Sequence, residues 1–150
     1  MMRLSDVFRS SAFSVAAFMA RYHDATALTR VFPGVTEALG RLADAGHPLG
    51  ICTNKPLGPT RVILEHFGLA SMMSAVIGGD SLPQKKPDPA PLRAALDLLG
   101  VAGDTPNAIY VGDSEFDADC AAAVPVAFLI FTRGYRLRPV SELPHLASFD

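Results

Sequence analysis

The apolar positions along the chain alternate between two spacings, which predict helices and strands in turn. Apolar residues three and four positions apart, bounded by Gly or Pro, predict helices at four places. Short unbroken apolar runs between those helices predict strands. The predicted helices start at Val35, Pro59, Ala90 and Asp117 and end before Gly46, Gly68, Gly100 and Val124, and the predicted strands are Pro48–Thr53, Ala75–Ile77, Ala108–Val111 and, as the last strand, Val126–Phe131.

This order of elements predicts an α/β fold with a Rossmann-like parallel sheet. Strands that are apolar throughout, rather than at every second residue, are typical of a sheet whose two faces are both covered by helices. In such sheets, ligands bind beyond the carboxyl ends of the strands, where loops from separate strands meet. Polar side chains at those ends are therefore the first candidates for a functional site.

The N-terminal part has its own pattern. Apolar residues recur at helical spacing from Leu4 to Met19, which predicts one amphipathic helix. The apolar stretch Ala12–Ala20 could imitate a signal peptide, but Asp6 stands in the region that should be basic and Ser14 interrupts the stretch. We therefore favour the helix and expect a cytoplasmic protein.

Composition narrows the class of protein further. A chain of 150 residues with 49% hydrophobic and 19% charged residues can fill one compact core. A net charge of −2 without long blocks of one sign argues against binding to nucleic acid. No apolar run is long enough to span a membrane, since the longest, Ala121–Phe131, covers about half a bilayer. Cys52 and Cys120 lack metal-type spacing and are expected to be reduced.

Pairs of polar residues stand at or soon after the ends of three of the predicted strands. Each pair alone is weak evidence, because such residues are common in loops and helix caps. Together they predict three loops that meet at one edge of the sheet and bind a small ligand there. The pairs are Thr53 and Asn54, Asp80 and Ser81, and Asp113 and Ser114.

Three stretches of the sequence resemble, in order, the second, third and fourth motifs of the haloacid dehalogenase superfamily. They are Ile51–Lys55, Lys86–Pro89 and Val111–Asp117. The longer stretches Gly79–Pro89 and Phe131–Tyr135 are similar to the phosphoglycolate phosphatase branch, and the resemblance runs from about Tyr22 to the C-terminus. It implies a magnesium-dependent phosphatase acting on a small phosphorylated metabolite such as 2-phosphoglycolate, through an aspartyl-phosphate.

The resemblance also implies roles for Thr53, Asn54 and Lys86. A phosphoryl group in transfer spreads negative charge over its oxygens, so its site needs hydrogen-bond donors and cations. The Thr53 hydroxyl and the Asn54 backbone N–H would hold phosphate oxygens, and Lys86 would supply a positive charge. A threonine at this position could also simply cap the strand. Lys85 competes with Lys86, but only Lys86 directly precedes the Pro-Asp-Pro turn, so we expect Lys85 to be a solvated charge.

The magnesium ligands implied by the resemblance are Asp113 and Asp117. The first would follow a strand and the second would lie in the first turn of the next helix, so both could face one cation. Magnesium prefers oxygen ligands and is often held by one or two carboxylates plus water and phosphate. We expect Asp113 to bind directly and Asp117 to bind directly or through a neighbour. Asp117 could in addition cap the helix.

The superfamily's first motif, a DxD strand end that carries the nucleophile, is not found before Thr53. The earlier aspartates are Asp6, Asp24 and Asp44, and none follows an apolar strand. We therefore expect an N-terminally truncated member, with residues 1–30 as a remnant of the cap domain and residues 31–150 as the core. The missing strand would lie centrally, between the strands ending at Thr53 and Asp113. We expect no phosphatase activity from this chain alone, and self-association through the unpaired sheet interior is possible.

Two other functions fit parts of the pattern. A non-catalytic or regulatory module could keep the phosphate- and magnesium-binding residues without turning over a substrate. A response-regulator receiver domain also combines Asp, Thr, Lys and magnesium. It is disfavoured because receivers need an early acidic cluster and carry the Lys after the Thr and the phosphoacceptor Asp.

Overall fold

The computed structural model describes residues 29–101, 107–124 and 126–150. The predicted helix between Leu4 and Met19, and all of the predicted cap remnant except Thr29 and Arg30, lie outside these residues. The elements are α2 Val35–Asp44, β1 Leu49–Cys52, α3 Leu57–His66, a 3-10 turn Ala70–Met72, β2 Met73–Ile77, α4 Ala90–Leu98, β3 Ile109–Gly112, α5 Glu115–Ala122, β4 Ala127–Phe131, a 3-10 turn Val140–Glu142 and β5 Ala147–Phe149.

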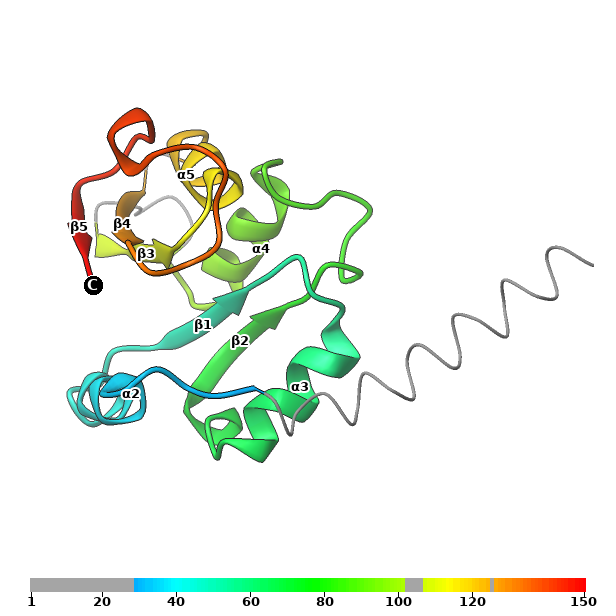
Figure 1. Ribbon diagram of the computed structural model, residues 1–150. Helices are drawn as coiled ribbons and strands as arrows, with labels where there is room; N and C mark the ends of the chain where they lie inside the picture. The colour runs from blue at the N-terminus through cyan, green and yellow to red at the C-terminus, as the bar shows by residue number, and fades with distance from the viewer. Residues whose placement is uncertain (1–28, 102–106, 125) are drawn as a thin grey trace, which may run out of the picture.

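All the strands pair in parallel, which confirms the predicted α/β class. They form a sheet of two strands, β1-β2, and a sheet of three strands, β3-β4-β5. Among the described residues no backbone pairing joins β1 to β3, so the sheet is interrupted where the resemblance places a further strand. Figure 1 shows the two sheets next to each other with α4 nearby, and α4 contacts β1 and β2.

The core lies where α5 packs on β3 and β4, and α4, which packs on β1 and β2, adds Leu92 and Leu96 to the same cluster. Ile130 and Cys120 are fully buried in it. Burial of such apolar side chains is the main force that holds helices on a sheet. The cluster comprises Leu92, Leu96, Ala118, Cys120, Ala121, Val124, Val126, Phe128, Ile130 and Leu143.

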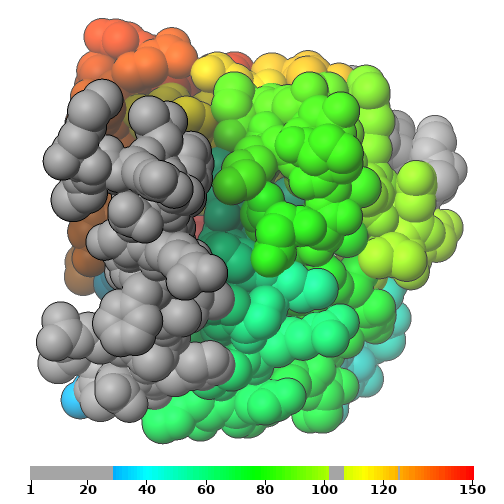
Figure 2. Space-filling model, turned by 90° about the vertical axis from the view of Figure 1, so that its right-hand side faces the viewer, coloured from blue at the N-terminus to red at the C-terminus, as the bar shows by residue number. Residues whose placement is uncertain are grey.

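The other face of β3 is open in the described part of the chain. Ile109 and Val111 are 64% and 52% exposed, whereas Tyr110 between them points toward the core and packs against Phe128. The sequence predicts helices on both faces, but the described helices cover β3 on its Tyr110 side only. Figure 2 shows a different side of the molecule, where the green segment between β2 and α4 forms much of the surface.

Two predicted helix starts were late by two residues. Helix α3 begins at Leu57 rather than Pro59, and Leu57 N–H is held by Asp80 Oδ1 at 2.7 Å. Helix α5 begins at Glu115 rather than Asp117, because Ser114 is the residue that caps it. Proline and acidic residues are tolerated throughout the first helical turn, where backbone N–H groups lack intrahelical partners, so they mark the turn but not its first residue.

The prediction that Val126–Phe131 contains the last strand was wrong. Residues Ala147–Phe149 form β5, which pairs with Leu129–Phe131 of β4. Three residues without a long apolar run give little local signal, and the strand exists only through its pairing with β4. Within the described ranges, no helix has the length and apolar character needed to cross a membrane.

Candidate active site

The carboxyl end of β1 carries Thr53 and Asn54, as predicted. Thr53 N–H donates to Ile77 O at 3.0 Å, which continues the pairing of β1 with β2. Its hydroxyl oxygen accepts from Lys55 N–H at 3.1 Å. Neither the Thr53 hydroxyl hydrogen nor the Asn54 N–H has an acceptor among the described residues. Two donors therefore remain available at this strand end.

The Asn54 side chain has a function that the sequence did not reveal. Its Nδ2 donates to Lys86 O at 2.9 Å, and its Oδ1 accepts from Lys86 N–H, also at 2.9 Å. This pair of bonds copies the pattern between two strands and ties the Lys86 loop to the end of β1. Gly79 lies close by, and a Cβ there would overlap the Asn54 carbonyl, so the two loops can meet only at a glycine.

The Lys86 ammonium group lies in the gap between the two sheets. It donates to Cys52 O at the end of β1 at 2.8 Å and to the Tyr110 hydroxyl on β3 at 3.0 Å. It also forms an ion pair with Asp117 Oδ1 at 2.5 Å. The two side chains of this pair are only 10% and 6% exposed. Lys86 is thus the side chain that links the two sheets at the predicted site.

Asp117 is buried, with 4% of its surface exposed, and both its oxygens are fully used. Oδ1 accepts from Lys86 and from the Tyr110 hydroxyl at 2.7 Å. Oδ2 accepts from the Ser114 hydroxyl at 2.7 Å and from the backbone N–H groups of Asp113 and Ser114 at 3.2 Å each. Burial alone would raise the pKa of Asp117, but the Lys86 charge and these hydrogen bonds outweigh burial and lower it.

Asp113 follows β3 and has one oxygen engaged. Its Oδ2 accepts from Tyr135 N–H at 2.8 Å. A Cβ at Gly134 would overlap the Asp113 carboxylate, so the loop after β4 can approach this carboxylate only through a glycine. Among the described residues, no group of three His, Cys, Asp or Glu side chains is arranged to hold a metal ion. Any cation here would be bound by few protein ligands.

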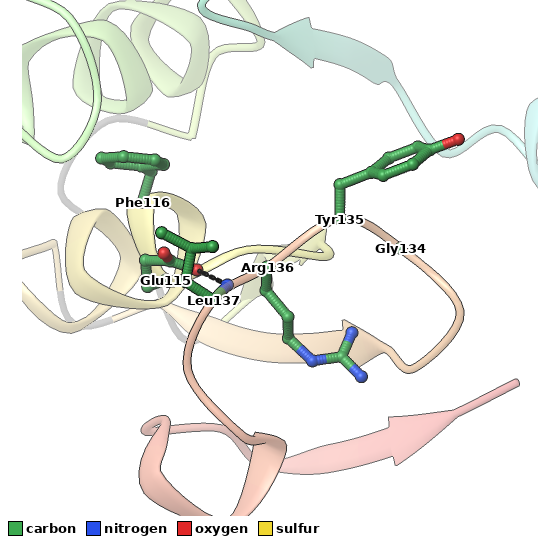
Figure 3. Close-up of a pocket in the computed structure, with 6 residues that line it drawn as sticks. All are labelled: Glu115, Phe116, Gly134, Tyr135, Arg136 and Leu137. Atoms are coloured by element: carbon green, nitrogen blue, oxygen red, sulfur yellow. Dashed lines mark hydrogen bonds between the residues drawn. The ribbon is translucent and has the colours of Figure 1, made fainter.

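A shallow hollow of about 420 Å³ lies next to Asp113. Residues from the start of α5 and from the loop after β4 line it, and Leu137 N–H donates to Glu115 Oε2 at 3.3 Å (Figure 3). Tyr135 and Leu137 are 90% and 94% exposed. In Figure 3 the Tyr135 ring points away from the Arg136 side chain, whose guanidinium is held by Phe131 O and Thr132 O. The hollow is therefore open to solvent and lies beside the loop that contacts Asp113.

The structure joins four of the predicted residues, Asn54, Lys86, Asp117 and Asp113, in one chain of contacts. Lys86 contacts both neighbours of Thr53 and is paired with Asp117, which in turn accepts from Asp113 N–H. The remaining predicted loop, which carries Asp80 and Ser81, has structural roles instead. Asp80 caps the start of α3, and the Ser81 hydroxyl accepts from Gly78 N–H at 2.9 Å.

Comparison with protein families identifies the family of the chain. Residues 4–131 match the family described as haloacid dehalogenase-like hydrolase, which is most of the sequence. The chain belongs to this family. The match spans every strand that carries a candidate residue.

The haloacid dehalogenase-like chain is similar to several curated phosphoglycolate phosphatases. It is 51% identical over 134 residues to one from Cereibacter sphaeroides, which covers 89% of this chain and 60% of that protein. It is 50% identical over 137 residues to one from Rhodospirillum rubrum, covering 91% of this chain and 56% of that protein. The chain thus spans about 60% or less of the length of these relatives.

Solved structures of the same family share the fold. The crystal structure of a predicted phosphoglycolate phosphatase from Haemophilus somnus has a TM-score of 0.75 and 34% identity, and covers 81% of this chain and 53% of that one. A haloacid dehalogenase-like hydrolase from Bacteroides fragilis has a TM-score of 0.77 and 26% identity, and covers 98% of this chain and 69% of that one.

Tyr110 is the site residue that sequence reasoning missed in this haloacid dehalogenase-like chain. The apolar run Ala108–Val111 predicts a strand and hides the hydroxyl of Tyr110 within it. The available signal was a hydroxyl in an otherwise apolar run, because a buried Tyr O–H usually has a hydrogen-bond partner.

Proposed function

We propose that this chain carries the phosphate- and magnesium-binding part of a phosphatase that hydrolyses a small phosphomonoester of the 2-phosphoglycolate type. The position of Lys86 carries this proposal. Its ammonium group lies at the carboxyl ends of β1 and β3, where the two sheets meet, and next to two unused donors at Thr53 and Asn54. Donors and a cation gathered at one strand edge suit an oxyanion in transfer.

Within this proposal, each residue has a separate task. The Thr53 hydroxyl and the Asn54 N–H bind phosphate oxygens, and Lys86 contributes positive charge. The Asn54 side chain sets the position of Lys86 through its two bonds to the Lys86 backbone. The carbonyl oxygen of Cys52, the residue before Thr53, accepts from the Lys86 ammonium group and limits how far this group can move.

The donor set fits a magnesium ion with few protein ligands. Asp113 keeps one carboxylate oxygen without a partner among the described residues, whereas both Asp117 oxygens are occupied by protein donors. We therefore assign direct binding to Asp113 and support of its loop to Asp117, whose Oδ2 holds Asp113 N–H. Magnesium bound there would neutralise charge on the phosphate oxygens, with water and phosphate completing its ligands.

The reaction of the relatives needs an attacking carboxylate, which the resemblance places in a DxD segment. The sequence before Thr53 contains no DxD. Neither Asp113 nor Asp117 is suited to replace it in this proposal, because one binds the metal and the other is fully hydrogen-bonded. We propose that the chain by itself binds phosphate and magnesium without turning over 2-phosphoglycolate.

The test is to titrate the purified chain with inorganic phosphate in the presence of magnesium and to assay release of glycolate from 2-phosphoglycolate. We expect saturable phosphate binding and no glycolate. Lys86→Met should weaken phosphate binding at least about tenfold, as expected for loss of a positive charge close to the phosphate, while Lys85→Met should leave it unchanged. Lys85 is the matched control because it is the adjacent lysine and is exposed.

A parallel pair of variants tests the magnesium assignment. Asp113→Asn should raise the magnesium concentration needed for half-maximal phosphate binding, whereas Asp119→Asn should not. Asp119 lies on α5, and within the described ranges its side chain makes only a long, exposed contact of 3.6 Å with Arg138. Equal effects of the two lysine variants, or of the two aspartate variants, would refute the site, and release of glycolate would refute the proposed lack of turnover.

A further inference from the structure

Tyr110 lies at the meeting point of the two sheets and contacts both members of the buried ion pair. Its hydroxyl donates to Asp117 Oδ1 at 2.7 Å and accepts from Lys86 Nζ at 3.0 Å. The ammonium group also lies 5.7 Å from the centre of the Tyr110 ring. One side chain on β3 therefore contacts the carboxylate and the ammonium together, and its ring packs against Phe128, at 5.7 Å between centroids.

The contacts of Lys86 leave little freedom to its ammonium group. An ammonium has three hydrogens. In this structure the acceptors for them are Cys52 O, the Tyr110 hydroxyl and Asp117 Oδ1. Cys52 belongs to β1, Tyr110 to β3 and Asp117 to α5, so the three acceptors come from three elements and fix the ammonium in space. If the Tyr110 acceptor is removed, one hydrogen of the ammonium loses its partner.

The Tyr110 hydroxyl stays protonated and so keeps donating to Asp117. Burial is the largest cause that raises the pKa of Tyr110, and the negative charge of Asp117 raises it further. The hydroxyl therefore donates to the carboxylate, with a longer contact of 3.5 Å to Cys52 O, and accepts from the ammonium. This direction of the hydrogen bonds suits a fixed bridge and does not suit a group that exchanges protons with substrate.

We propose that Tyr110 is a positioning residue, whose hydroxyl holds the Lys86 ammonium and the Asp117 carboxylate in the arrangement that binds phosphate. The structural half of this inference stands on the contacts above. The consequence for phosphate rests on the proposed function, because it needs Lys86 to contribute to phosphate binding. A preorganised charge binds an anion more tightly than a mobile one, since its side chain loses less freedom on binding.

The experiment compares Tyr110→Phe with Tyr135→Phe in the full chain. Both changes remove one hydroxyl oxygen, but the Tyr135 side chain is 90% exposed and only its backbone N–H contacts Asp113. The first readout is the NMR signal of the Lys86 ammonium hydrogens, assigned with Lys86→Arg. We expect a protected signal in the unmodified chain and in Tyr135→Phe. In Tyr110→Phe we expect exchange with water to be at least about fivefold faster, as loss of one hydrogen bond implies.

The second readout is affinity for inorganic phosphate with magnesium. Tyr110→Phe should weaken it about threefold to tenfold, and Tyr135→Phe should not change it. Unchanged ammonium exchange in a folded Tyr110→Phe protein would overturn the inference, as would phosphate binding that is equal or tighter. A purely structural role would lower the melting temperature without changing the ammonium signal of the molecules that remain folded.

The experiment separates failure of this inference from failure of the proposed function, and it also covers the case in which Tyr110→Phe does not fold. If the unmodified chain binds no phosphate, the proposed function fails, but the ammonium readout still decides the role of Tyr110. If Tyr110→Phe does not fold, the unmodified chain provides the answer. A slowly exchanging Tyr110 hydroxyl proton close to the Lys86 ammonium hydrogens supports the bridge, and its absence there overturns it.

Discussion

Replacing Asp117 by Asn tests the buried ion pair most directly. The Asp117 carboxylate accepts from Lys86 and Tyr110 with one oxygen and from Ser114 and the Asp113 backbone with the other. An asparagine amide has one oxygen and one NH₂ group. Whichever way it is turned, its NH₂ group faces donors at a position where a carboxylate oxygen accepted from them. The variant therefore loses both the charge and several hydrogen bonds.

The expected cost follows from these contacts. Removing one partner of a buried ion pair costs about 3–5 kcal/mol, because the other charge is left uncompensated. Asp117→Asn should be at the upper end of this range, since Lys86 would keep only the neutral acceptors Cys52 O and Tyr110. Lys86→Met should cost less, about 2–3 kcal/mol, because Asp117 would keep the Tyr110 and Ser114 hydroxyls and two backbone donors.

The assay is urea unfolding at neutral pH, followed by circular dichroism, for both single variants and the double variant. The double variant should be less destabilised than the sum of the two by at least about 1 kcal/mol, because it leaves no unpaired charge, whereas each single variant does. Asp119→Asn is the control and should change stability by about 0.5 kcal/mol or less, since its contact with Arg138 is exposed. Strict additivity, or a Lys86→Met variant less stable than Asp117→Asn, would refute the reasoning.

Three further predictions concern the same edge of the sheet. Because the pKa of Asp117 is lowered in the folded chain, the stability that its carboxylate contributes is present above its unfolded pKa of about 3.9 and is lost as pH falls through its folded pKa. In acid unfolding, the free energy of unfolding of the unmodified chain should therefore decrease as pH falls through this range. Asp117→Asn should lack this decrease. Gly134→Ala should displace the Asp113 carboxylate and weaken magnesium binding, measured by line broadening with manganese, and unchanged broadening would contradict it. Asn54→Ala should remove both bonds to the Lys86 backbone, cost about 1–3 kcal/mol in urea unfolding and weaken phosphate binding, and an unchanged phosphate affinity would argue against the clamp.

Local sequence was enough to predict most of the elements and the strand ends. The run before Thr53 and the run before Asp113 are apolar and short, so each predicts a buried strand whose next residues lie at the sheet edge. Their order along the chain fixes a parallel arrangement, because every pair of strands is separated by a helix or a long connection. Residues at the ends of such strands must then come close together, whatever their separation in sequence.

Only the tertiary structure showed the three-residue strand β5 and the hydrogen-bond partners of the individual site atoms. Lys86 lies 34 residues from Cys52, 24 from Tyr110 and 31 from Asp117 along the chain, so no local pattern could reveal their contacts. The sequence left open whether Asp117 would bind a metal directly or through a neighbour, and the structure shows that its oxygens are occupied by protein donors.

The sequence by itself determined which residue types stand at the strand ends, since hydrophobic spacing and glycine positions specify short elements locally. Only the folded chain decided which donor meets which acceptor. Hydrogen bonds act over about 3 Å and depend on direction, so they form between groups that packing brings together rather than between neighbours in sequence. The Asn54 clamp and the Tyr110 bridge are therefore properties of the assembled sheet edge and not of any one motif.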